Sequence, residues 1–384
     1  MLTLDTWCIL QPLDDLDRLM FIHATPGAKV KYRKKKYNVD AVINQPYGSV
    51  FELTKRSLQL VDMKARATVD DIRRNGEKAA TAASKSGATA SDNRNLVDNN
   101  TAQKLKQSDV QAMKDSGASA GDIISSLVAN SSTFSNKTEF SQAKYIKKKQ
   151  KQFAPTFRIV PCSSAIMVDA LHFKDARRIC GLRSDGIAQL LARGNIRAFC
   201  KVIVVENAMG LVVGSAAERM MGNGTIINLM LGDHPNVTMV PRFNLPPNAT
   251  EDVIVHFPFT STPLLVDALH RTETETNATE DRSFESWQPS KHIASITQTA
   301  NVLKPCGADS FICVVSEKYQ ALSIFTSILP LLVSGASFSI FCPFIEPLKE
   351  LHLYARTNNV AVDVSLTQLW VREFQVLPGR TRPR

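Results

Sequence analysis

One stretch of the sequence, Lys201 to Gly222, limits most strongly what this chain can fold into. Its letters are KVIVVENAMGLVVGSAAERMMG, which predict a buried strand over Lys201 to Val205, a tight turn, and a helix beginning near Leu211. This order is typical of α/β nucleotide-binding folds, in which a Gly-rich turn brings backbone N–H groups and a helix N-terminus to a cofactor. The stretch therefore predicts a nucleotide-type fold around one central strand.

The turn departs from the pattern that a bound nucleotide requires. An S-adenosylmethionine loop is expected to read acid-x-Gly-x-Gly-x-Gly, and the matching positions here are Glu206, Ala208, Gly210 and Val212. A Cβ atom at Ala208 or Val212 would crowd backbone that must touch the ligand. The ribose-binding acid expected further along could only be Asp233, which lies in a turn. We expect a degenerate loop, with no cofactor bound by this chain.

Apolar, β-type runs alternate with helical patterns on both sides of this stretch. Parallel strands buried on both faces read as such runs, so the alternation predicts a doubly wound, Rossmann-like α/β sheet. The expected strands cover Phe157 to Pro161, Lys201 to Val205, Thr225 to Leu231, Val253 to Val255, Phe311 to Val315, Phe338 to Cys342 and Val360 to Val364. The segment at about 271–289 is acidic and poor in apolar residues, and we expect it to be disordered.

The uncharged stretch from Ala321 to Phe344 is long enough to span a bilayer. Pro330, Gly335 and Pro343 interrupt it, so we favour a buried helix followed by a strand, and we expect no membrane contact.

The first half of the chain reads as smaller, separate parts. Short alternating runs divided by turn residues predict a small, barrel-like β domain, with strands that include Val39 to Ile43. Helices are expected to begin at Ser108 and Ser119 and to cover Thr138 to Gln152. The predicted domains are a β domain at 1–63, a flexible linker and polar RNA-contacting segment at 64–107, a helical basic segment at 108–156, and a methyltransferase-like domain at 157–384.

The net charge of +10 comes entirely from the N-terminal part. Residues 1–160 hold 26 Lys and Arg against 16 Asp and Glu, whereas residues 161–384 hold 20 of each. This one-sided charge indicates a polyanionic partner, either nucleic acid or an acidic membrane face.

Two basic segments stand out. The first, Lys29 to Lys36, suits a solvated sheet edge, a nuclear import signal or an RNA contact. The second, five lysines between Lys144 and Lys151, favours a phosphate-binding stripe on a helix.

Catalytic chemistry is not indicated by any motif. The seven histidines have no zinc-like spacing, and neither a nucleophile elbow nor a phosphate-binding Walker loop occurs. The seven cysteines are scattered and never spaced C-x-x-C, which is typical of a reducing compartment and argues against structural zinc.

Four strings together resemble one family. They are DNRNLVDNNTAQKL, KTEFSQAKYIKKKQKQF, GLRSDGIAQLLARGNIR with the following AMGLVVGSAAERMMGNGTI, and TQLWVREFQVLPGRTRP. They resemble the non-catalytic, tRNA-binding subunit of the eukaryotic tRNA (adenine-58-N1)-methyltransferase, from about Lys29 onward. The resemblance implies a nuclear heterotetramer with two copies of this chain and two of a homologous catalytic subunit. That partner would bind S-adenosylmethionine, and the complex would make 1-methyladenosine in the T loop of tRNA.

The resemblance also implies which residues contact tRNA. From the polar segment it points to Asn93, Arg94, Asn95 and Lys104, and from the basic helix to Lys144, Lys147, Lys148, Lys149 and Lys151. In the C-terminal domain it points to Lys174, Lys318, Arg356, Arg380 and Arg382.

Two other functions compete with this interpretation. One is a general RNA-binding adaptor in translation initiation, which would not prefer tRNA over other structured RNA. The other is a methyltransferase that acts alone, which the substitutions in the turn disfavour and a cofactor titration would test.

Overall fold

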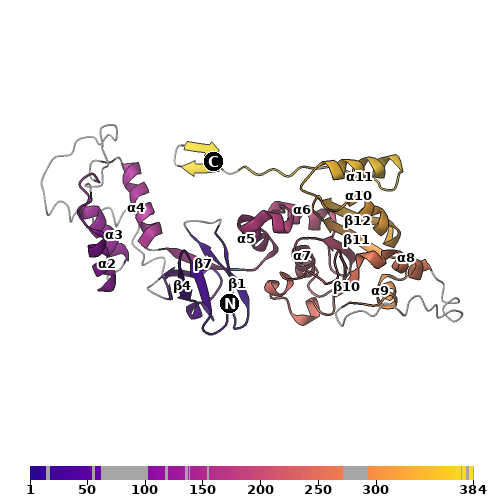
Figure 1. Ribbon diagram of the computed structural model, residues 1–384, viewed down its shortest axis with the longest axis horizontal. Coiled ribbons are helices and arrows are strands. Elements are labelled where there is room, and N and C mark those ends of the chain that lie inside the picture. Colours follow the sequence, from indigo (N-terminus) through magenta and orange to yellow (C-terminus); the bar gives the residue numbers. More distant parts are fainter. Residues whose placement is uncertain are drawn as a thin grey trace. The chain divides into compact units, whose positions relative to one another are not determined.

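The computed structural model consists of two compact units, Met1–Pro161 and Cys162–Arg384 (Figure 1). The structure describes residues 1–13, 18–53, 57–61, 103–116, 120–134, 137, 139–153, 155–270, 293–372, 374–377 and 380–383. The expected disordered insert and most of the expected linker lie outside these residues.

The N-terminal unit is built on an antiparallel sheet in the order β2-β1-β7-β5-β6. Its strands are β1 (Trp7–Pro12), β2 (Met20–His23), β5 (Val50–Leu53), β6 (Leu58–Leu60) and β7 (Thr156–Pro161). A separate hairpin pairs β3 (Lys29–Tyr32) with β4 (Lys35–Asn38). Side chains from the sheet and the hairpin, including Phe51, Tyr32 and Phe157, share one apolar core.

Two expectations for this region are wrong. The strand at 157–161 belongs to the N-terminal sheet, between β1 and β5, and not to the second domain. Its alternate residues Phe157 and Ile159 fill the N-terminal core, a long-range pairing that local pattern does not reveal. The run Val39 to Ile43 contains a short 3-10 helix, Asp40–Val42, and not a strand. The Asn38 side chain accepts the N–H of Asp40 at 2.7 Å, which starts a turn in place of an extended segment.

The described part of the N-terminal unit also contains three helices, close to where the sequence predicts them. They are α2 (Gln107–Asp115), α3 (Ala120–Ala129) and α4 (Glu139–Phe153). Helices α3 and α4 share a small core that contains Ile124, Val128 and Ile146. This packing decides which face of α4 is buried and which faces solvent.

The C-terminal unit contains a parallel sheet in the order β10-β9-β8-β11-β12. The strands are β8 (Lys201–Glu206), β9 (Thr225–Met230), β10 (Ile254–Pro258), β11 (Ala308–Val314) and β12 (Leu332–Phe341). Strand β8 lies centrally, and the chain order reverses between β8 and β11. This strand order confirms the predicted doubly wound sheet. In open α/β sheets, ligands bind at the place where the order reverses.

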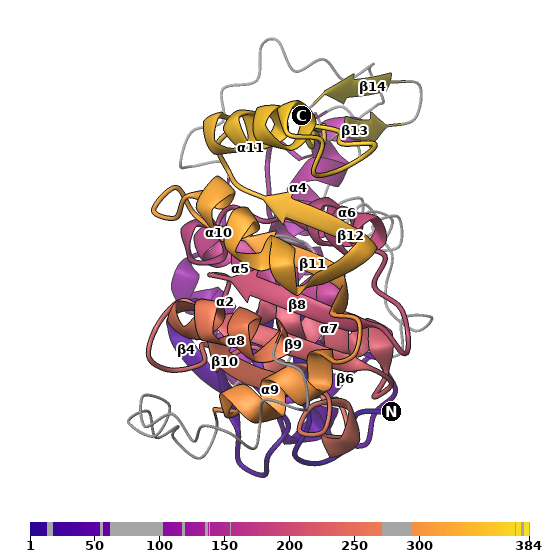
Figure 2. The same ribbon diagram turned by 90° about the vertical axis from the view of Figure 1, so that its right-hand side faces the viewer.

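Two layers of helices cover this sheet (Figure 2). The helices are α5 (Ser164–Asp175), α6 (Ser184–Arg193), α7 (Leu211–Met220), α8 (Thr262–His270), α9 (Ile296–Leu303), α10 (Ala321–Ile328) and α11 (Glu346–Thr357). Alternate residues such as Ile203 and Val205 share a core with α8, α9, α10 and α11. Helices α5, α6 and α7 contact one another in the other layer.

The uncharged stretch forms a helix and a strand, α10 and β12, as the interrupting proline and glycine residues predict. Within the described part of the chain, no helix combines the length and apolar character needed to cross a bilayer. The strand expected over Val360 to Val364 does not form, and Asp363 there has a left-handed φ of 52° that interrupts extended backbone. Beyond it, β13 (Phe374–Leu377) pairs with β14 (Arg380–Pro383).

Candidate nucleic-acid interface and nucleotide turn

The nucleotide turn is occupied by the chain's own carboxylate. Glu206 ends β8, and its side chain accepts the backbone N–H of Val213 at 2.7 Å and that of Val212 at 3.3 Å. These are N–H groups of the first turn of α7, which in a nucleotide-binding fold are available to a ligand. Burial raises the pKa of the Glu206 carboxyl to about 7, although the backbone hydrogen bonds act in the opposite direction.

A later segment of the chain packs directly on this turn. The N–H of Met239 donates to the carbonyl of Met209 at 3.0 Å, and Ala208 is fully buried. Gly210 adopts a φ of 81°, and a Cβ atom there would lie 2.6 Å from the Cα of Val237. The surviving glycine is therefore required by the fold, because the Val237 backbone occupies the space above it.

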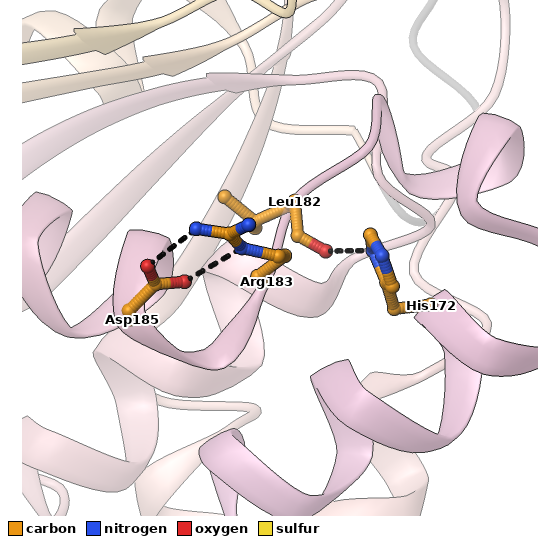
Figure 3. A network of polar contacts seen from close by, with 4 residues as sticks. All are labelled: His172, Leu182, Arg183 and Asp185. Carbon is orange, nitrogen blue, oxygen red and sulfur yellow. Dashed lines mark hydrogen bonds and ion pairs between the residues drawn. The ribbon is translucent and has the colours of Figure 1, made fainter. Parts of the chain in front are cut away.

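A polar network fixes the corner between α5 and α6 (Figure 3). Arg183 donates to Asp185 through two hydrogen bonds of 3.1 and 2.7 Å, and a ring nitrogen of His172 lies 3.0 Å from the Leu182 carbonyl. The Arg183 guanidinium holds the pKa of Asp185 below its usual range. The thiol of Cys180, in the same corner, donates a hydrogen bond to the Asn207 carbonyl in the nucleotide turn at 3.4 Å. The corner therefore supports the turn from one side.

In the N-terminal unit, α4 separates its apolar and basic residues. Ile146 is fully buried, whereas Lys144, Lys147 and Lys148 are exposed. Positions three and four residues apart lie on the same side of a helix, so these three lysines form one stripe, which we call the α4 stripe. Among the described residues, no ion pair involves a lysine of the stripe. A row of uncompensated cations on a rigid element suits a polyanion.

Lys149 differs from the α4 stripe. Its ammonium lies 5.4 Å from the ring centre of Tyr145 and 5.8 Å from that of Phe153, and the residue is half-buried. Burial lowers its pKa, and the neighbouring charge of Lys148 lowers it further. Lys151 is also half-buried, so the five predicted lysines are not equivalent.

The structure brings Lys104 close to this helix. The side chain of the preceding residue, Gln103, donates to the Leu127 carbonyl at 2.9 Å and contacts the hydroxyl of Tyr145 on α4 at 3.4 Å. Lys104 is exposed, and its N–H donates to the Asn130 carbonyl at 3.1 Å. Asn93, Arg94 and Asn95 lie outside the described residues.

The predicted residues of the C-terminal unit do not form one described cluster. Lys174, Lys318, Arg356 and Arg382 are exposed, in the last turn of α5, in the loop after β11, in the last turn of α11 and on β14 respectively. Arg380 is placed on β14 by its backbone alone.

Sequence reasoning missed two features. It did not foresee that the Glu206 side chain accepts N–H groups of the first turn of α7, although an acid near a helix N-terminus is favourable there. It also could not foresee that Arg33, in the β3–β4 turn, donates to the Lys151 carbonyl at 3.0 Å, because 118 residues separate the two.

Comparisons with known proteins agree on one family. Residues 1–291 match the model described as the Gcd10p family, so the similarity includes the first 28 residues, before the start of the motif resemblance. A relative from Dictyostelium discoideum is 35% identical over 98% of this chain and 75% of its own length. One from Mus musculus is 30% identical over 93% of this chain and 80% of its own. Both are named tRNA (adenine(58)-N(1))-methyltransferase non-catalytic subunit.

Among solved structures, an S-adenosylmethionine-dependent O-methyltransferase from Thermotoga maritima is 9% identical over 100% of this chain and 88% of its own. The TM-score of this match is 0.49.

Proposed function

The chain belongs to the Gcd10p family and is a non-catalytic subunit of the tRNA (adenine-58-N1)-methyltransferase, and we propose that it grips tRNA while a homologous subunit binds S-adenosylmethionine. The α4 stripe carries this proposal. It presents exposed lysines at helical spacing, and Lys104 is held beside the same helix by Gln103. Phosphate contacts of this kind supply affinity without reading sequence.

The predicted contacts outside this surface remain part of the proposal. Asn93, Arg94 and Asn95 would extend the RNA contact from the segment before Lys104. The basic residues of the C-terminal unit would add separate contacts. These are Lys174, Lys318, Arg356, Arg380 and Arg382. In the N-terminal unit, Lys149 and Lys151 flank the α4 stripe and would add contacts beside it.

We propose further that this chain binds no S-adenosylmethionine. Glu206 already accepts the N–H groups at the start of α7, and the segment through Val237 and Met239 packs on the turn. A ligand would have to displace both the carboxylate and this segment. The methyl donor therefore belongs on the catalytic partner.

The assembly and location follow from the family resemblance. We propose two copies of this chain with two catalytic subunits, in the nucleus. Mass measurement of the co-expressed complex and imaging of the tagged chain test these points separately.

Methyl transfer to a tRNA transcript tests the main proposal. The co-expressed pair is expected to methylate the T-loop adenine, and each chain alone is expected to be inactive. A titration of this chain alone with S-adenosylmethionine should show no binding. If this chain alone bound the donor and methylated tRNA, the division of labour would be wrong.

The preference for tRNA over other structured RNA distinguishes this proposal from the general RNA-binding adaptor. The pair should bind tRNA more tightly than structured RNA of equal length, whereas a general adaptor would bind both equally.

A further inference from the structure

We propose that the β3–β4 hairpin forms a second tRNA-backbone contact, continuous with the α4 stripe. This inference rests on the proposed function, since it names a further part of the same tRNA surface. The hairpin covers residues 29–38, with the sequence KVKYRKKKYN, and contains no acidic residue.

The arrangement of charges on the hairpin is unfavourable for the isolated fold. Lys31 pairs with Lys36 directly across the two strands, and both are exposed. Like charges at directly opposite positions repel each other. Lys29, Lys34 and Lys35 are exposed as well, and the described residues supply no ion pair to any of these five lysines. An anion that binds across the hairpin would relieve this repulsion.

Arg33 ties the hairpin to helix α4. Its backbone adopts a left-handed φ of 54°, where glycine or asparagine would meet less steric resistance. Its guanidinium donates to the Lys151 carbonyl at 3.0 Å and lies 5.2 Å from the ring centre of Tyr32, whose side chain is buried in the core. The hydrogen bond holds the hairpin turn against the last turn of the helix that carries the α4 stripe.

The strand geometry suits a phosphate chain. Val30 and Tyr32 point into the core, so Lys29 and Lys31 point outward from the same face. Outward residues two apart on a strand are separated by roughly 6.6 Å. This separation is comparable to that between successive phosphates of a nucleic-acid strand, which favours RNA over a compact acidic ligand.

The same lysines could instead serve as a nuclear import signal. Their backbone is paired in a hairpin, with Val30 opposite Tyr37 and Lys31 opposite Lys36, so the segment is not a free extended peptide. Its side facing the core also carries Val30 and Tyr32, which are buried. These features favour a contact made by the folded surface.

The test compares three variants of this chain, each co-expressed with the catalytic subunit to form the complex. The hairpin variant carries Lys31→Gln, Lys35→Gln and Lys36→Gln. The helix variant carries Lys144→Gln, Lys147→Gln and Lys148→Gln. A matched control, with the same change of charge, carries Arg178→Gln, Arg193→Gln and Lys349→Gln at exposed positions outside both surfaces. Binding to an unmodified tRNA transcript is measured between about 50 and 200 mM salt.

We expect the hairpin variant to bind tRNA at least about 10-fold more weakly at the same salt, with a salt slope shallower by about 2. Its melting temperature should stay equal or rise, because cross-strand repulsion is removed. The control should match the wild type.

The outcomes separate this inference from the proposed function. If the helix variant loses affinity and the hairpin variant matches the control, the hairpin inference alone is overturned. If neither variant loses affinity for tRNA, the proposed tRNA-binding function is overturned as well. A hairpin variant with normal tRNA binding that no longer accumulates in the nucleus would overturn the inference in favour of an import signal.

Discussion

On the α4 stripe, three lysines face solvent with no ion pair among the described residues, whereas at the start of α7 the Glu206 carboxylate already accepts the backbone N–H groups. Both places are suited to phosphates or other anions, one by its side chains and the other by its backbone N–H groups. The lysines of the α4 stripe are open to solvent, whereas the N–H groups at the start of α7 are already bonded to Glu206. The difference supports our proposal that this nucleotide-type fold keeps its sheet while its binding surface lies on α4.

The largest effect on the α7 turn is expected from a substitution of Gly210. A Cβ atom there would lie 2.6 Å from the Val237 backbone, at a φ of 81°. We expect Gly210→Ala to lower the free energy of unfolding by about 3 kcal/mol or more, because the clash adds to the cost of left-handed backbone. Denaturation of the complex measures this.

Gly232→Ala is the matched control, since nothing lies within 4 Å of its Cβ position. It should change stability by less than about 0.5 kcal/mol. Equal stability of the two variants would mean that Gly210 is not held by packing.

A second test concerns the charge of Glu206. Burial raises the pKa of this carboxyl from its ordinary 4.5 to about 7, so the folded state holds the proton more tightly than the unfolded state. Stability from this group is therefore complete below pH 4.5 and is lost as the pH rises through 7. Between pH 5 and 8 we expect the wild type to lose on the order of 2 kcal/mol more than Glu206→Gln. Parallel slopes for the two proteins would contradict the burial of this carboxyl.

Within α4, Lys148 is an exposed cation, whereas Lys149 is packed against aromatic rings. Lys148→Gln should weaken tRNA binding by roughly 3- to 10-fold, because it removes an exposed charge of the α4 stripe. Lys149→Gln should affect tRNA less but cost about 0.5 kcal/mol of stability, since its ammonium lies over Tyr145 and Phe153. Filter binding and thermal unfolding of both variants measure this, and the reverse order would remove the distinction.

The smallest effect is expected at the corner that supports the turn. Asp185→Asn removes the two-point contact with Arg183, and we expect a loss of about 0.5 kcal/mol, since both side chains are about one-third exposed. The lowered pKa of Asp185 means that this contribution is present at neutral pH and is lost as the pH falls through its folded value. A loss that persists unchanged in acid would point to packing instead.

Local pattern predicted the features that depend on neighbouring residues. It predicted the strand and helix around Glu206, the alternation of the C-terminal unit and the basic face of α4. It failed where distant residues meet. The assignment of β7 depends on pairing with β1 and β5, and the bond between Arg33 and Lys151 spans 118 residues. Ala208 and Val212 indicate the substituted turn from sequence alone, but the segment around Val237 that covers it carries no comparable motif.

We propose that this chain binds tRNA and that its partner binds the methyl donor. Steady-state kinetics of the complex with Lys144→Gln, Lys147→Gln and Lys148→Gln test it most directly. We expect a KM for tRNA at least about 10-fold higher, with kcat and the KM for S-adenosylmethionine within twofold of the wild type. An unchanged KM for tRNA, or a raised KM for the methyl donor, would contradict it.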